Sequence, residues 1–240
     1  MTRLPYNLDV DDPSAPPMGL IVLSTDETVE PEFRRYFADH PSPIYVSRIP
    51  SGLEVTTETL SAMETALPAS ADLLPKARPY AVVGYGCTSA SSVIGSERVE
   101  QMVQRSCDVP VVTNPLRAAT ACAADLGISK LALLSPYIEE VNEPLRNAFA
   151  ANGITMDCFG TFGERKEAKV VRIAQRSVVD AATALGSESS VEGVFLSCTN
   201  LRTIDAIPEI EARIGKPVLS SNQSLAWHMR KITAAQTGKV

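Results

Sequence analysis

The sequence predicts an α/β protein with two similar lobes, each built on a parallel β-sheet, and with the functional site in the cleft between the lobes. Short apolar runs alternate with amphipathic helical stretches, and the residues that follow these runs repeat in the second half of the chain. Continuous apolar strands that alternate with helices are typical of parallel sheets. The predicted divisions are an N-terminal extension (1–17), a first lobe (18–115), a second lobe (116–222) and a C-terminal helix (223–240) that packs back on the first lobe.

The predicted strands are short runs of β-branched and large apolar residues, which packed strands favour. They span 19–23, 44–46, 80–83, 109–112, 130–134, 154–159, 193–196 and 217–219. The predicted helices lie between these runs and have apolar residues at helical spacing. They span 55–74, 96–106, 116–126, 139–152 and 167–185. This alternation is the order of consecutive βαβ units.

An internal repeat is visible where corresponding strands end. Cys87 follows Ser24 by 63 positions, and Cys198 follows Ser135 by 63 positions. The residue types around these positions also match, so the two halves are interpreted as copies of one α/β unit, related by a pseudo-two-fold axis. Ligands of open α/β sheets bind outside the carboxyl ends of the strands. Two lobes that face each other therefore place Cys87 and Cys198 on opposite walls of one cleft.

The composition is that of a globular chain with an acidic charge balance. Its 240 residues carry a net charge of −6, and 45% of them are hydrophobic, which supports a packed core. An acidic chain without a basic cluster is not expected to bind nucleic acid. No apolar stretch reaches the ~20 residues of a membrane span, and residues 1–17 lack the apolar segment of a secretory signal. We expect a cytoplasmic protein without nucleic-acid or membrane partners, whose apolar composition allows a homodimer.

Two of the five cysteines are candidates for chemistry. The number is odd, no pair has CxxC spacing, and only two histidines are present, so the sequence predicts no metal site. Cys107, Cys122 and Cys158 lie in ordinary contexts and are expected to be small buried hydrophobic residues. Cys87 and Cys198 differ because they follow equivalent strands.

Small polar residues follow both candidate cysteines. Thr88 and Ser89 come after the first cysteine, and Thr199 and Asn200 come after the second. Helices are expected to begin shortly after each group, near residues 91 and 203. Free N–H groups at a helix N-terminus bind carboxylates and favour a thiolate over a thiol. Each half of the chain is therefore predicted to supply a reactive sulfur and a carboxylate-binding cradle.

Four motifs occur in a fixed order and cover nearly the whole chain: "GLIVLSTDETVEPE", "GYGCTSAS", "LLSPYIEEVNEPL" and "LSCTNLRTIDAIPEIEARIGKPVLSSNQSLAWHM". Together they resemble the aspartate/glutamate racemase superfamily, in the branch of maleate isomerases, arylmalonate decarboxylases and racemase-like proteins of ectoine-utilisation clusters. The resemblance implies that Cys87 and Cys198 are catalytic and that Thr88, Ser89 and Tyr137 hold a substrate carboxylate. It implies neither a metal ion nor an organic cofactor. Arylmalonate decarboxylases have glycine in place of the first cysteine, which disfavours a pure decarboxylase here.

One residue departs from the pattern of the maleate isomerases. Those enzymes have a substrate-binding asparagine at the end of the first strand, where this chain has Asp26. An ionised carboxylate close to a substrate carboxylate would cost on the order of a few kcal/mol in a semi-buried cleft. We therefore predict a substrate that carries nitrogen, such as an amino-acid derivative. Two other interpretations remain: Asp26 is protonated, or it caps the following helix.

The predicted function is a cofactor-independent two-cysteine racemase or isomerase that acts on a small carboxylate. One cysteine removes the α-proton, the other protonates the opposite face, and Thr88, Ser89, Tyr137, Thr199 and Asn114 stabilise the enediolate. The first alternative is a maleate cis-trans isomerase that forms a covalent adduct on Cys87. The second is an arylmalonate-type decarboxylase, and the third is a carboxylate-binding protein without catalysis.

Overall fold

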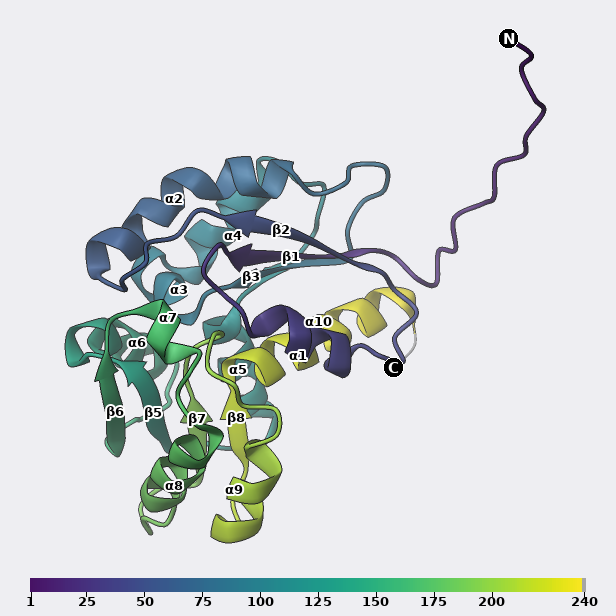
Figure 1. Ribbon diagram of the computed structural model, residues 1–240. Helices are drawn as coiled ribbons and strands as arrows, with labels where there is room; N and C mark the ends of the chain where they lie inside the picture. Colours follow the sequence, from purple (N-terminus) through teal and green to yellow (C-terminus); the bar gives the residue numbers. More distant parts are fainter. Residues whose placement is uncertain (239–240) are drawn as a thin grey trace.

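The computed structural model describes residues 1–238 and has two lobes, each with a four-stranded sheet in which every strand pair is parallel (Figure 1). The first sheet has the order β2-β1-β3-β4 and the second has the order β6-β5-β7-β8. The two lobes thus repeat one strand order, and the predicted fold class is confirmed. The strands are β1 (Met18–Leu23), β2 (Ile44–Ile49), β3 (Val82–Gly86), β4 (Val112–Thr113), β5 (Leu131–Tyr137), β6 (Phe159–Glu164), β7 (Gly193–Leu196) and β8 (Val218–Ser220).

Helices cover both faces of each sheet. On the first sheet, α1 and α10 pack on one face and α2 and α4 on the other; on the second sheet, α5 and α6 oppose α8 and α9. The helices are α1 (Val29–Tyr36), α2 (Thr57–Asp72), α3 (Thr88–Ile94), α4 (Ser96–Gln104), α5 (Pro115–Asp125), α6 (Glu139–Ala151), α7 (Glu167–Val170), α8 (Gln175–Gly186), α9 (Ile207–Ile214) and α10 (Ser221–Thr237).

The C-terminal helix α10 follows the last strand of the second lobe but packs on the first sheet (Figure 1). Leu225, Ala226 and Met229 are buried there against β1 and β3. Gly84 in β3 allows this approach, because a Cβ atom at that position would lie 2.7 Å from the Sδ atom of Met229. The predicted end of this helix, at 239–240, lies outside the described residues.

Several predicted boundaries were wrong. The predicted strand at 154–159 overlaps β6 only at Phe159. Before β6, Thr155 forms an isolated parallel bridge with Lys130, and Ile154 and Met156 are buried in the core of the second lobe. The predicted helix at 167–185 is divided into α7 and α8, and the carbonyl of Ile173 between them accepts a hydrogen bond from Arg202. Helix α1 was not predicted. The expected helix starts near residues 91 and 203 lie at Thr88 and Ile207.

Residues 1–13 are exposed and lead away from the body of the protein (Figure 1). Across the described part of the chain, no helix combines the length and apolarity needed to cross a membrane.

Candidate active site

A small cavity lies between the lobes, where the carboxyl ends of both sheets meet. Its volume of about 20 Å³ is enough for roughly one water molecule. Loops and helix starts of both lobes form its walls, including the segments after β1, β2 and β3 of the first lobe and after β5, β6 and β7 of the second. The lining residues are Leu23, Asp26, Ser51, Gly52, Glu54, Val55, Thr59, Leu60, Met63, Cys87, Thr88, Ser89, Tyr137, Glu167, Cys198, Thr199 and Asn200.

Cys87 enters the cavity from the first lobe. It is the N-cap residue of α3, and its Sγ atom accepts a hydrogen bond from the N–H of Ala90 at 3.4 Å. Burial raises the pKa of the Cys87 thiol to about 12, while the N–H group of Ala90 acts in the opposite direction. The helix N-terminus therefore has the predicted effect on the thiol, but desolvation in the closed cavity outweighs it.

Cys198 enters from the second lobe with an unusual backbone conformation. Its φ of 103° lies in the region that favours glycine, and such strain costs on the order of 1–3 kcal/mol. The conformation is held by two hydrogen bonds: the Cys198 N–H donates to Ser221 Oγ at 3.0 Å, and the Asn200 N–H donates to Cys198 Sγ at 3.3 Å. The surrounding structure thus fixes the sulfur at the cavity wall. Burial raises the pKa of the Cys198 thiol well above its ordinary value.

Tyr137 connects Cys198 to a buried carboxyl group that the sequence analysis missed. The Tyr137 hydroxyl donates to Glu167 Oε1 at 2.7 Å and lies 2.9 Å from Cys198 Sγ. Either group can be the donor in the Tyr137–Cys198 contact, and this hydrogen bond lowers the pKa of Cys198. Asn200 Nδ2 donates to Glu167 Oε2 at 2.8 Å. Burial raises the pKa of Glu167.

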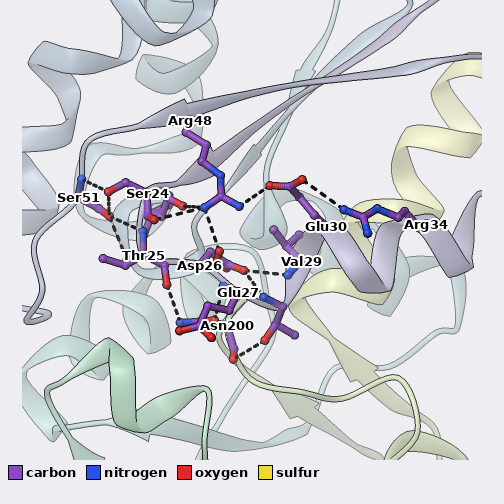
Figure 2. Close-up of polar contacts among 12 residues, drawn as sticks. Ser24, Thr25, Asp26, Glu27, Val29, Glu30, Arg34, Arg48, Ser51 and Asn200 are labelled. Atoms are coloured by element: carbon purple, nitrogen blue, oxygen red, sulfur yellow. Dashed lines mark hydrogen bonds and ion pairs between the residues drawn. The ribbon is translucent and has the colours of Figure 1, made fainter.

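The two carboxylate oxygens of Asp26 have different surroundings: one caps a helix, and the other is buried without a hydrogen bond within the described residues. Oδ1 accepts hydrogen bonds from the N–H groups of Thr28 and Val29, both at 2.8 Å, at the start of α1 (Figure 2). The capping interpretation of Asp26 therefore applies to this oxygen. Oδ2 is buried and has no hydrogen-bond partner among residues 1–238. Burial raises the pKa of Asp26, although the two N–H groups lower it.

The loop that carries Asp26 is held from both sides (Figure 2). Arg48 donates from Nη1 to the backbone carbonyl of Asp26 at 3.0 Å and forms an ion pair with Glu30. Asn200 of the second lobe accepts the N–H of Glu27 on its Oδ1 at 2.9 Å. The position of Asp26 therefore depends on contacts with both lobes.

Hydroxyl groups join the two lobes beside the sulfurs. Thr88 Oγ1 lies 2.7 Å from Ser221 Oγ, the same oxygen that accepts the N–H of Cys198. Thr199 donates from Oγ1 to the backbone carbonyl of Gly86 at 3.2 Å. Both threonines line the cavity, and so does Ser89.

The structure brings together eight of the nine residues that the sequence analysis placed in the site. The exception is Asn114, which caps α5: its Oδ1 accepts the N–H of Arg117 at 3.0 Å and the hydroxyl of Ser96 at 3.1 Å. Glu167 was missed because it belongs to no motif and begins a single-turn helix. Its partners are 30 and 33 positions away in the chain.

The loops after β2 and β6 meet above the cavity. Glu54 and Lys166 form an antiparallel bridge, in which the Val55 N–H donates to the Arg165 carbonyl at 2.9 Å and the Glu167 N–H donates to the Leu53 carbonyl at 3.2 Å. The cavity as it stands holds about one water molecule, so it must widen to bind an organic substrate, and we expect the two bridged loops to be the part that separates. Among residues 1–238, no group of three or more His, Cys, Asp or Glu side chains is arranged to hold a metal ion.

A family model described as arylmalonate decarboxylase matches residues 18–239 of this sequence. The chain belongs to the arylmalonate decarboxylase family. Its relatives include the arylmalonate decarboxylase of Bordetella bronchiseptica, which is 29% identical over 221 residues. The alignment covers 89% of each chain. The maleate isomerase of Alcaligenes faecalis is 25% identical over 236 residues, with 92% of each chain covered.

Solved structures of the family share the fold. A double mutant of arylmalonate decarboxylase in a liganded form has a TM-score of 0.79 at 26% identity, with 90% of this chain and 92% of that chain covered. A cysteine-to-serine mutant of the maleate cis-trans isomerase of Nocardia farcinica, with a covalently bound succinylcysteine intermediate, has a TM-score of 0.78 at 24% identity, with 91% and 92% covered. The two-lobed architecture is therefore that of the family.

Proposed function

We propose that this protein is a cofactor-independent racemase or isomerase that uses Cys87 and Cys198 on a small carboxylate substrate carrying nitrogen, such as an amino-acid derivative. The observation that carries the proposal is that the two sulfurs come from different lobes and line one cavity. Family members named arylmalonate decarboxylase and maleate isomerase support an enzyme but do not determine the reaction.

In the proposed racemisation, Cys87 acts as the base and Cys198 as the acid for one enantiomer. Cys87 must first lose its thiol proton to solvent, because burial raises its pKa to about 12 in the substrate-free protein. Cys87 takes the α-proton, and the electron pair of the broken C–H bond moves into the carboxylate to form an enediolate. Cys198 then gives its proton to the opposite face of the carbon and becomes the thiolate. The reverse reaction exchanges these roles. The assignment of Cys198 as the thiol is supported by its burial, which raises the pKa of the thiol well above its ordinary value although the hydrogen bond to Tyr137 lowers it.

Hydroxyl groups beside the sulfurs are suited to the developing enediolate. Thr88 and Ser89 at the start of α3 and Thr199 of the second lobe line the cavity. Hydrogen-bond donors that are held in place before the reaction stabilise developing negative charge without reorganisation. We assign Thr88 and Ser89 to the substrate carboxylate. Thr199 joins them once its hydroxyl turns away from the Gly86 carbonyl, because it has a single proton to donate.

The leading alternative is cis-trans isomerisation. The relatives named maleate isomerase favour it, as does the neighbouring structure with a succinylcysteine intermediate. In this reaction, Cys87 adds to an alkene carbon, rotation occurs about the resulting single bond, and elimination releases the trans acid. Asp26 and Glu167 speak against maleate as the substrate, because a dianion would lie beside two buried carboxyl groups.

Decarboxylation is the second alternative, and the arylmalonate decarboxylase of Bordetella bronchiseptica is the relative that favours it. It requires a single proton donor after loss of carbon dioxide, which leaves Cys87 without a role. A carboxylate-binding protein without turnover would need neither sulfur.

Hydrogen–deuterium exchange tests the proposal. In heavy water, the wild-type protein should place deuterium at the α-carbon of small amino acids. The incorporation is measured by NMR or mass spectrometry. Cys87→Ser and Cys198→Ser should each lower this rate by at least about 10²-fold, since each removes an acid–base group. Cys122→Ser, which changes a buried cysteine in α5, is the control. A covalent adduct on Cys87 with maleate and no α-exchange would support the isomerase alternative instead.

A further inference from the structure

We propose that Asp26 and Glu167 together form a subsite for a protonated amino group, so that the substrate is a small amino acid with a free ammonium rather than an N-acylated derivative. This inference rests on the proposed function, because it concerns the substrate of the same cavity. It adds Glu167 as a residue that determines specificity.

The two carboxyl groups both line the cavity, one from each lobe. Asp26 follows β1 and Glu167 begins α7, and both line the cavity. Asn200 connects them: its Nδ2 donates to Glu167 Oε2 at 2.8 Å, and its Oδ1 accepts the N–H of Glu27, the residue after Asp26. The negative charge of Asp26 also raises the pKa of Glu167, so the two groups influence each other.

Asp26 offers a buried acceptor to a ligand. It is 3% exposed, and no hydrogen bond to its Oδ2 is found within residues 1–238, although the Thr199 side chain lies close enough to lower the pKa of Asp26. A buried acceptor left without a donor costs about 1–3 kcal/mol, and more when it is charged. Each oxygen of Glu167 has one donor, from Tyr137 or from Asn200, and each retains a free lone pair. An ammonium group brings three donors and can satisfy both residues.

The charge of the cavity selects ammonium over a neutral amide. Within residues 1–238, the lining includes three acidic residues and neither lysine, arginine nor histidine. Arg48 is close to Asp26 but donates to backbone carbonyls and pairs with Glu30. An amide N–H could satisfy Oδ2, but it would leave Arg48, which lowers the pKa of Asp26 only as the smallest of its causes, as the one positive charge acting against the repulsion between the two carboxylates. A positive charge removes it.

Part of the lining is apolar. Leu60 and Met63 of α2 line the cavity together with Leu23 and Val55. The polar part includes the hydroxyls assigned to the substrate carboxylate, and also Ser51, Thr59 and Tyr137. This arrangement fits a compact amino acid whose side chain packs on α2.

Binding is measured on the full chain with both sulfurs replaced (Cys87→Ser/Cys198→Ser), so that turnover plays no part. The probes are alanine, 2-aminobutyrate and aspartate, in both enantiomers. Each is compared by calorimetry with its 2-hydroxy counterpart (lactate, 2-hydroxybutyrate and malate) and with its N-acetyl derivative. We expect at least one amino acid to bind about tenfold or more tightly than both of its counterparts. The preference should disappear when Asp26→Asn or Glu167→Gln is added.

Glu27→Gln is the matched control. Glu27 is the next residue in the same loop, but it is exposed and pairs with Arg172 outside the cavity. This substitution removes the same charge and should keep the preference. Circular dichroism shows whether each variant is folded, and either of the two cavity substitutions alone is sufficient for the test.

Three results would overturn the inference: equal or tighter binding of the hydroxy or acetyl compounds, no binding by any amino acid, or a preference that survives both substitutions. Its failure is distinct from failure of the proposed function. Amino acids that bind without α-exchange by the wild type would contradict the racemase and leave the ammonium subsite standing. Exchange of the α-proton on an N-acyl substrate would support the racemase and contradict the ammonium subsite.

Discussion

At the scale of single residues, Asp26 combines a structural and a functional role in one side chain. One oxygen caps α1, and the other is buried without a partner among residues 1–238. A buried acceptor without a donor lowers the stability of the substrate-free protein. We interpret this loss of stability as a consequence of the binding site, because binding requires an acceptor that the protein itself does not satisfy.

Asp26→Asn is predicted to stabilise the protein at neutral pH. The amide oxygen can keep both N–H contacts, and the buried carboxylate is lost, so we expect a gain on the order of 1 kcal/mol. Burial raises the pKa of Asp26 in the folded state, so the folded protein retains a proton that the unfolded chain releases above its ordinary value of 3.8. Stability from this group is therefore present at low pH and is lost as pH rises through the raised pKa.

Thermal unfolding of the wild type and Asp26→Asn at a series of pH values measures this effect. The variant should gain over the wild type as pH rises from 4 toward neutrality. An advantage that stays constant, or that decreases with pH, would contradict the prediction.

Local signals explain which site residues the sequence could predict. Both cysteines stand at equivalent strand ends in the repeat, so their position in the fold followed from topology. Asn114 also follows a strand, but it comes directly before helix α5, which has proline at its first position. An asparagine in that place is expected to cap the N-terminus of the helix. Glu167 has no such signal, because only the packing of the two lobes brings it to Tyr137.

At the scale of elements, the loops after β2 and β6 control access to the cavity. Glu54 and Lys166 are opposite each other, and the hydrogen bonds on either side join their neighbours rather than the pair itself. In antiparallel pairs of this type the Cα atoms are about 4.5 Å apart, within the range of a disulfide. The geometry therefore allows these loops to be closed covalently.

A double variant, Glu54→Cys/Lys166→Cys, tests this control of access. When the disulfide is formed, the α-proton exchange activity should fall by at least about 10²-fold, because substrate cannot reach the sulfurs. Reduction should restore it, and the two single variants should be unaffected by oxidant. Full activity of the oxidised double variant, with the disulfide confirmed by mass spectrometry, would show that substrate enters by another route.

The errors in element boundaries have a common cause. Ile154 and Met156 lie in the connection before β6 and are buried in the core of the second lobe. A run of buried apolar residues looks the same in the sequence whether it forms a strand or a connection. Helix α1 has few apolar residues and contains Pro31 in its first turn, so its apolar pattern is short. The strands of the sheet centres, buried on both faces, were predicted within a few residues.

At the scale of the whole molecule, the duplicated strand order explains why the site lies between the lobes. Equivalent loops of the two halves face each other, and each half brings one sulfur. The halves are not independent, because α10 leaves the second lobe and covers the first sheet, and Ser221 at its start contacts both Thr88 and Cys198. The repeat in the sequence predicted the facing arrangement, but not the contacts that Ser221 makes beside both sulfurs.

The proposed racemisation requires two sulfurs to act on opposite faces of one carbon. A crystal structure of the wild-type protein with a bound amino acid measures this directly. We expect Cys87 Sγ and Cys198 Sγ on opposite sides of the α-carbon, each about 3–3.5 Å from it, as proton transfer at both faces requires. Two sulfurs on the same face, or one sulfur out of reach while the other contacts the carbon, would contradict it.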